Sequence, residues 1–155
     1  MREEHLFGIH LYPATVRLDT APGAREIGTV HGGEFMITED RDGTTSVRDV
    51  ATGHCYPLNR DRKATEGFLE AFAEYLSSGP AVPSPVTMTA EQAAQRLRAF
   101  QEGQIRPPSF SPGSGLSHRA RLKKLRKRLR AIDRAASGPS SWWSGLIDEA
   151  ENDLL

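Results

Sequence analysis

The fold is decided by residues 27–76, which read IGTVHGGEFMITEDRDGTTSVRDVATGHCYPLNRDRKATEGFLEAFAEYL. Apolar and β-branched runs separated by turn residues predict strands over 34–38, 44–50 and 54–58. Asp42-Gly43 favours a two-residue hairpin between the first two strands, and Thr52-Gly53 marks the turn into the third. Three strands joined by tight turns form an antiparallel meander.

A helix is predicted directly after the meander, over 65–76, with Thr65 as its N-cap and Ser77 to Pro80 as its end. Two short strands are also expected upstream, within 5–11 and 15–18. The apolar residues of the helix recur every three or four positions, as on one helical face: Phe68, Leu69, Phe72, Ala73 and Leu76. The sequence therefore predicts an α+β fold, an antiparallel sheet meander with packed helices.

Further helices are predicted over 87–102, capped by Thr89, over 118–136, and from 140 or 141 onward. The last one carries adjacent tryptophans, of which we expect one to be buried and the other half-exposed, because neighbouring helical residues cannot both face inward. We expect a sheet-plus-helix core over 1–78, a Pro-rich linker with one helix over 79–117, and a helical part over 118–155 that packs on the core.

The composition gives little indication of a partner, because the 155-residue chain has a formal net charge of zero. The charges are nevertheless segregated: the charged residues in 119–134 are almost all basic, and those in 148–153 are acidic. Because Cys55 is the single cysteine, an intramolecular disulfide is excluded. We expect its thiol to be buried. The first residues lack a signal-peptide pattern, and no apolar run reaches the ~20 residues of a membrane span. We expect a cytoplasmic protein.

Four segments occur in a suggestive order along the chain. They are Ile27-Gly28 before Gly32-Gly33, 47–50 before Thr52-Gly53, Leu58-Asn59 before 68–72, and Ile132-Asp133 before Trp143, Leu146-Ile147 and 153–155. In this order they resemble the SUKH superfamily of bacterial immunity proteins, especially its actinobacterial branch. The resemblance implies a sheet with helices and a non-enzymatic protein that neutralises a toxin by binding it directly.

No catalytic or metal-binding pattern accompanies this fold. The five histidines lack ligand spacing, and adjacent His54 and Cys55 in a strand would point to opposite faces. No general acid–base pair or nucleophile with its base stands out in the sequence. We therefore expect no enzymatic activity, no metal and no cofactor.

Two surfaces are candidates for binding a partner. For a protein toxin we expect contacts from the hairpin, which carries Glu39, Asp40, Asp42 and Arg48, and from Trp142. The alternative is the basic helix, which would bind nucleic acid through Arg121, Lys124 and Arg128. The same helix could instead pack on the core and pair with the acidic C-terminal helix, or meet an acidic protein. The sequence leaves these readings open.

Overall fold

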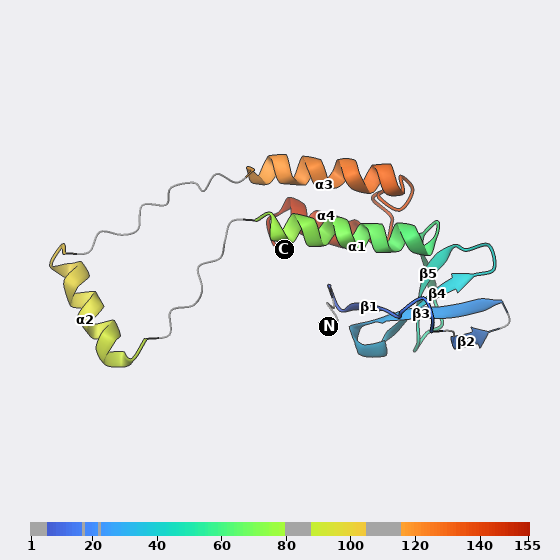
Figure 1. The fold of residues 1–155 in the computed structure, drawn as a ribbon, viewed down its shortest axis with the longest axis horizontal. Coiled ribbons are helices and arrows are strands. Elements are labelled where there is room, and N and C mark those ends of the chain that lie inside the picture. Colours follow the sequence, from blue (N-terminus) through green and yellow to red (C-terminus); the bar gives the residue numbers. More distant parts are fainter. Residues whose placement is uncertain (1–5, 17, 22, 80–87, 105–115) are drawn as a thin grey trace. The chain divides into compact units, whose positions relative to one another are not determined.

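The computed structural model describes residues 6–16, 18–21, 23–79, 88–104 and 116–155, and it divides the chain into two compact units. The first unit comprises the chain up to Ser77 together with Ser117–Leu155, and the second is Ser78–Leu116. The strands are β1 (Ile9–Leu11), β2 (Leu18–Ala21), β3 (Ala24–Val30), β4 (Phe35–Asp40), β5 (Thr45–Asp49) and β6 (Cys55–Asn59) (Figure 1). The helices are α1 (Arg62–Ser77), α2 (Ala90–Gln101), α3 (His118–Ile132) and α4 (Ser144–Glu151), with a 3₁₀ turn at His31–Gly33.

The sheet is antiparallel and six-stranded, and its centre is the meander β3-β4-β5-β6. β1 and β2 share the remaining edge of β3, with β1 opposite Gly28–Val30 and β2 opposite Ala24–Glu26. Across the meander Ile37 lies opposite both Gly28 and Val47, so these positions face the same side of the sheet. The predicted α+β class and the antiparallel meander are confirmed, and β3 extends the meander by one strand.

The hairpin between β4 and β5 differs from the predicted two-residue turn. The Asp40 N–H donates to the Thr44 carbonyl at 2.9 Å, so the turn consists of the three residues 41–43. Gly43 takes the left-handed conformation at φ +87°, which glycine adopts without the steric penalty of a Cβ atom. The position of the turn was predicted correctly, but its loop has three residues instead of two, and the left-handed Gly43 is the last of them.

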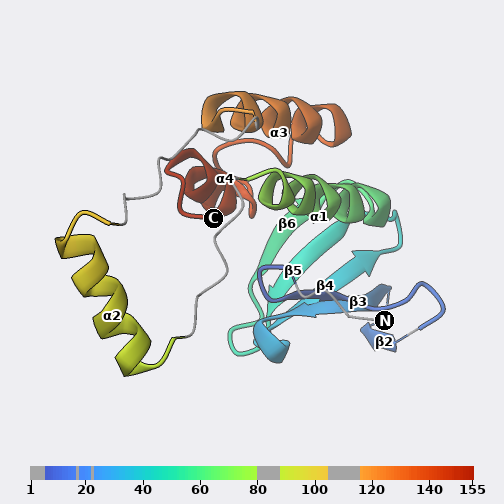
Figure 2. The ribbon, with the colours of Figure 1, turned by 60° about the vertical axis from the view of Figure 1, so that its left-hand side comes forward.

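Helix α1 covers one face of the sheet (Figure 2). Phe68 and Phe72 are fully buried, as are Ile37 and Val47 of the sheet. Thr65 is not the N-cap, because it lies inside the helix and is itself buried. Asp61 caps the helix instead: its Oδ1 accepts the Ala64 N–H at 2.7 Å.

The remaining helices begin and end inside their predicted ranges. Thr89 caps α2 in a capping box with Gln92, as its sequence predicts. Helix α3 packs on α1 and ends at Ile132, four residues earlier than expected. Asp133 is extended at φ −151°, and its carboxylate is held by other parts of the chain. The tryptophans precede α4, which begins only at Ser144.

The thiol of Cys55 was expected to be buried, but it is exposed on β6. Because β6 pairs only with β5, this edge strand leaves several of its side chains, from Cys55 to Pro57, open to solvent. Within the described parts of the chain, no helix is long and apolar enough to cross a membrane.

Candidate functional site: an exposed aromatic cluster

Trp143 anchors the segment that precedes α4. Its indole is completely buried and packs against Phe68 and Phe72, with ring centroids 5.2 and 5.9 Å away. The indole N–H donates to Asn59 Oδ1 at 3.0 Å, so its one polar group is satisfied inside the core. This contact ties the C-terminal part of the chain to the end of β6.

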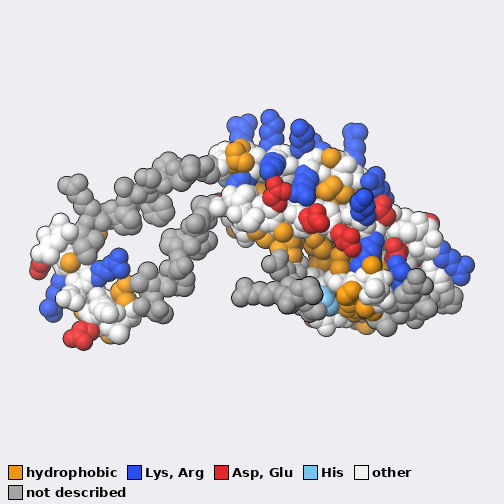
Figure 3. Space-filling model, viewed as in Figure 1, with side chains coloured by type: hydrophobic (Ala, Val, Ile, Leu, Met, Phe, Trp, Pro, Cys, Tyr) orange, Lys and Arg blue, Asp and Glu red, His pale blue; other side chains and the backbone are white. Residues whose placement is uncertain are grey.

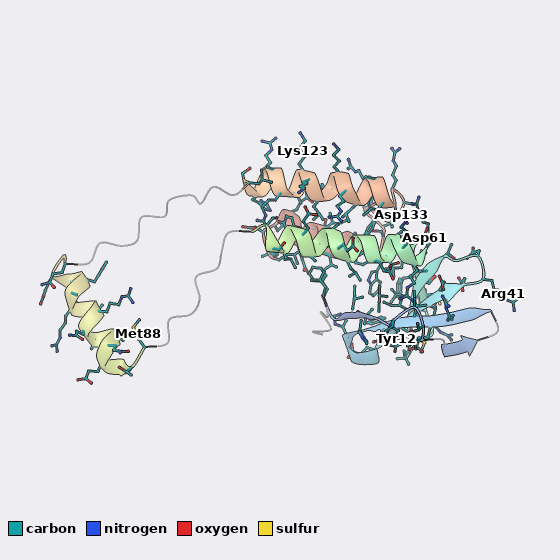
Figure 4. The ribbon with its side chains drawn as sticks, in the orientation of Figure 1. Tyr12, Arg41, Asp61, Met88, Lys123 and Asp133 are labelled. Carbon is teal, nitrogen blue, oxygen red and sulfur yellow. The ribbon has the colours of Figure 1, made fainter. Side chains whose placement is uncertain are left out.

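Asn59 is the centre of a buried polar network. Its Oδ1 also accepts the Thr65 hydroxyl at 3.2 Å, and its Nδ2 donates to Asp133 Oδ2 at 3.4 Å. Asp133 further accepts the backbone N–H groups of Arg60, at 2.8 Å, and Ala136, at 3.2 Å. Asp133 lies at the C-terminal end of α3, near the start of α1 (Figure 4). The network therefore fixes the connection from α3 to α4, because buried polar groups without partners would be costly.

Because Trp143 points into the core, the side chain of the adjacent Trp142 lies closer to the surface. It is half-buried, and its ring contacts Phe35 of β4 and Tyr56 of β6, with centroid distances of 5.5 and 5.7 Å. The prediction that one tryptophan is buried and the other half-exposed is confirmed. Trp142 is therefore held in a fixed orientation with part of its indole in solvent.

The aromatic cluster extends from Trp142 in both directions. The ring of His54 lies 4.7 Å from that of Tyr56, and the ring of His31 lies 6.5 Å from that of Phe35. We call these five residues, His31, Phe35, His54, Tyr56 and Trp142, the aromatic cluster. Both histidines are exposed, and Tyr56 keeps 39% of its surface in solvent. This part of the surface therefore consists of adjoining rings contributed by three separate segments.

The border of the aromatic cluster adds an exposed aliphatic side chain and a carboxylate. Val50 follows β5 and is 54% exposed, and its N–H donates to the Glu34 carbonyl beside Phe35. Asp49 lies opposite Phe35, and hydrogen bonds from the turn at Thr52 and Ala51 lower the pKa of its carboxyl. The cluster thus has an apolar centre with an ionised group at its edge, the arrangement found in many protein interfaces.

The predicted toxin-contact residues do not form one site. Asp40 and Asp42 are exposed at the hairpin, which is at the far end of β4 from Phe35, about 17 Å along the strand. Glu39 is paired with Arg25 across the sheet, so its carboxylate is already engaged. Arg48 is exposed on the face of the sheet opposite to that of buried Val47. The structure brings only Trp142 to the aromatic cluster.

The hairpin carboxylate Asp42 also has a local role. Its Oδ1 accepts the Thr44 hydroxyl at 2.7 Å and the Thr44 N–H at 2.9 Å. These hydrogen bonds lower the pKa of the Asp42 carboxyl, because they stabilise its charged form. Asp42 therefore shapes the turn and remains exposed at the same time.

The residues predicted for nucleic-acid binding all bond to residues of α1. Arg121 is only 6% exposed, and its guanidinium lies 4.4 Å from the ring centroid of Tyr75 while donating to the Tyr75 carbonyl at 2.8 Å. The guanidinium of Arg121 is therefore not accessible to nucleic acid in this structure. Lys124 Nζ lies 2.6 Å from a Glu74 oxygen, and Arg128 pairs with the same carboxylate. All three lie beside the leucine residues that pack on α1: Lys124 and Arg128 meet an acidic residue of that helix, and Arg121 meets Tyr75.

Sequence reasoning missed Phe35, His54 and Tyr56 as parts of a site. Each was placed in or beside a predicted strand, but no contact was inferred between them. The strand register was the usable signal: Phe35 pairs with Asp49, and Val47 pairs with Tyr56, which places both rings at the same end of the sheet. The contacts of Phe35 and Tyr56 with Trp142 join residues far apart in the sequence, and no local sequence pattern predicts them.

The described residues hold no group of three or more histidine, cysteine or acidic side chains placed to bind a metal ion. Comparison with known proteins adds no relative: no family model, no curated protein and no solved structure matches the chain.

Proposed function

We propose that this chain is a non-enzymatic, cytoplasmic immunity-type protein that binds a bacterial protein toxin and blocks it. The observation that carries the proposal is the aromatic cluster, with Trp142 at its centre and Tyr56 and Phe35 against it. Tryptophan and tyrosine are the residues most enriched among the few that dominate the energy of protein interfaces.

The aromatic cluster is suited to binding because it is held in place before a partner arrives. The position of Trp142 is set by the burial of its neighbour Trp143, whose indole N–H is hydrogen-bonded to Asn59. A side chain that is already ordered loses less conformational entropy on association than a mobile one. A blocking protein benefits from this, since tight binding is its whole activity.

The choice of a toxin as partner rests on the resemblance described above. Asn59, Asp133 and Trp143 come from segments that carry the resemblance, and they join one buried network. This is the expected result if those segments together support one fold. Asp40 and Asp42, exposed at the other end of the sheet, are proposed to affect the rate of association through their charge.

The proposal is tested by recovering the partner and then reconstituting the block. The tagged chain is purified from its native cells after nuclease treatment, and any stoichiometric protein is identified by mass spectrometry. That protein is then expressed alone and together with this chain in a neutral host. Growth arrest relieved by co-expression supports the proposal. A partner whose expression does no harm, or arrest that this chain does not relieve, contradicts it.

A matched pair of variants then tests the surface. Val50→Asp adds a charge next to Asp49, the residue opposite Phe35, at a side chain that is 54% exposed, so the fold tolerates it. Val16→Asp makes the same change at a valine between β1 and β2 that is 37% exposed. We expect at least about tenfold weaker toxin binding for Val50→Asp and no change for Val16→Asp. Equal affinities for both variants would place the interface elsewhere.

A further inference from the structure

The cations of α3 divide into two groups with different surroundings. The helix contains no acidic residue between His118 and Ile132, while eight of its residues are lysine or arginine. One group faces α1 and α4. Besides Arg121, Lys124 and Arg128, it includes Arg126, whose guanidinium lies 2.5 Å from Glu151. The carboxylates of the neighbouring helices and the Tyr75 carbonyl satisfy this inner group.

The second group forms a row on the outer side of the helix, which we call the outer row: Arg119, Lys123, Lys127 and Arg130. Their spacing of four, four and three residues keeps them within about 80° of arc on a helix that turns 100° per residue. All four are exposed, and no carboxylate among the described residues pairs with them. Figure 3 shows blue side chains projecting in a line along this edge, and Figure 4 shows Lys123 pointing away from α1.

The side chains around the outer row limit the class of partner that it fits. Helical geometry places Ala120 and Ala131 on the same side, with Arg126 at its edge, where Arg126 pairs with Glu151 of α4. A protein interface normally has an apolar core, and a helix that lies on a membrane needs large apolar side chains beside its cations. Single-stranded nucleic acid calls for aromatic side chains on which bases stack. Duplex RNA has a deep, narrow major groove that side chains do not read, and proteins recognise it by its shape and through 2′-hydroxyl and phosphate contacts across the minor groove. The outer face of α3 has no apolar core, no large apolar side chain and no aromatic side chain.

A row of cations with nothing else around it matches the sugar–phosphate backbone of double-stranded DNA. We propose that the outer row binds this backbone without reading the base sequence. From Arg119 to Arg130 the row spans about 16 Å, at 1.5 Å per residue. One DNA strand presents a phosphate every ~3.4 Å of helix axis, so about five phosphates of a strand fall within that length.

This inference goes beyond toxin binding and is independent of it. The outer row lies on α3, whereas the aromatic cluster is formed by the 3₁₀ turn, the sheet and the segment before α4. Either surface can therefore fail its own test while the other is retained.

The test is a salt titration of the full chain with a fluorescent DNA duplex of about 20 base pairs, followed by anisotropy. Four phosphate contacts predict that log K falls with log salt at a slope of about −3.6. Between about 50 and 200 mM salt the affinity should therefore fall about 150-fold. Replacing two members of the row, Lys123→Gln and Lys127→Gln together, should reduce the slope to about −1.8.

A matched control removes two exposed cations elsewhere, Arg41→Gln and Arg96→Gln together. It lowers the net charge by the same amount and should leave the slope near that of the unmodified chain. All variants change exposed side chains, so circular dichroism should show the same fold. The proposal is overturned if the duplex does not bind at about 50 mM salt, or if the two double variants behave alike.

Alternative ligands provide the remaining outcomes. Single-stranded DNA, duplex RNA, and vesicles of phosphatidylcholine and phosphatidylserine in a roughly three-to-one ratio are titrated under the same conditions. Tighter binding to duplex DNA than to each of these supports the proposal. Tighter binding to any of them assigns the outer row to that ligand and overturns it.

Discussion

Replacing Asn59 by alanine tests whether the buried network holds the C-terminal part of the chain in place. Asn59 is 6% exposed, and its side-chain oxygen is the acceptor for the indole N–H of Trp143 at 3.0 Å. The substitution leaves that N–H inside the core without a partner. It also removes the amide that donates to Asp133 Oδ2.

The size of the effect follows from counting what is left unsatisfied. A buried donor that loses its partner costs about 1–3 kcal/mol of stability. Thr65 adds little, because its hydroxyl still has the Thr45 hydroxyl at 3.0 Å and the Asp61 carbonyl at 3.3 Å. Asp133 keeps two backbone donors. With the packing lost by truncation, we expect about 2–4 kcal/mol in total. That is a large fraction of the about 5–15 kcal/mol by which proteins are stable.

The measurement is urea unfolding followed by tryptophan fluorescence and circular dichroism. Asn152→Ala serves as the control: Asn152 is exposed, and its amide makes one solvent-exposed hydrogen bond, to the Asp148 carbonyl, whose loss should cost about 1 kcal/mol or less. A double-mutant cycle with Trp143→Phe isolates the hydrogen bond, and its coupling energy should be about 0.5–3 kcal/mol. Stability loss below about 0.5 kcal/mol for Asn59→Ala, or strict additivity in the cycle, would refute the reasoning.

Substitutions at three further positions test other features of the fold. The hydrogen bond from Lys124, together with the charges of Lys124 and Arg128, lowers the pKa of Glu74. The Glu74 carboxylate therefore stabilises the folded state above the ordinary glutamate pKa, and this contribution disappears as pH falls through the lowered pKa. Urea midpoints of the unmodified chain and Glu74→Gln should therefore differ at neutral pH in low salt and converge as the pH falls below the ordinary glutamate pKa; a constant gap would contradict this. Asp61→Ala should cost about 1 kcal/mol by removing the α1 cap, whereas Asp61→Ser, which can still cap, should cost much less in the same assay. Gly28→Ala should cost about 1–3 kcal/mol, because a Cβ atom would lie 2.3 Å from a backbone carbonyl oxygen of β1, and an unchanged unfolding midpoint would show that β1 moves away freely.

The sequence predicted those elements whose signals are local. The meander followed from the apolar runs on either side of the turns at Asp42-Gly43 and Thr52-Gly53, and the start of α2 followed from Thr89 as its cap. The errors occurred where a local signal competed with a distant contact. Thr65 is a good capping residue, but it lies in the first turn of α1, where its hydroxyl donates a hydrogen bond to Asn59. Cys55 has the usual preference for burial, but it lies on an edge strand.

The two candidate surfaces, the aromatic cluster and the outer row, also depend partly on local sequence and partly on distant contacts. The sequence alone determined that one tryptophan of the pair must face outward, since adjacent side chains point in different directions, and that the cations concentrate in 119–134. Tertiary structure decided that Trp142 meets Phe35 and Tyr56, and that the inner cations of α3 are neutralised while the outer row is not. Side-chain direction along one element is set by backbone geometry, which local sequence encodes. Contacts between elements far apart in the chain depend on how the whole core packs, and no local pattern specifies that.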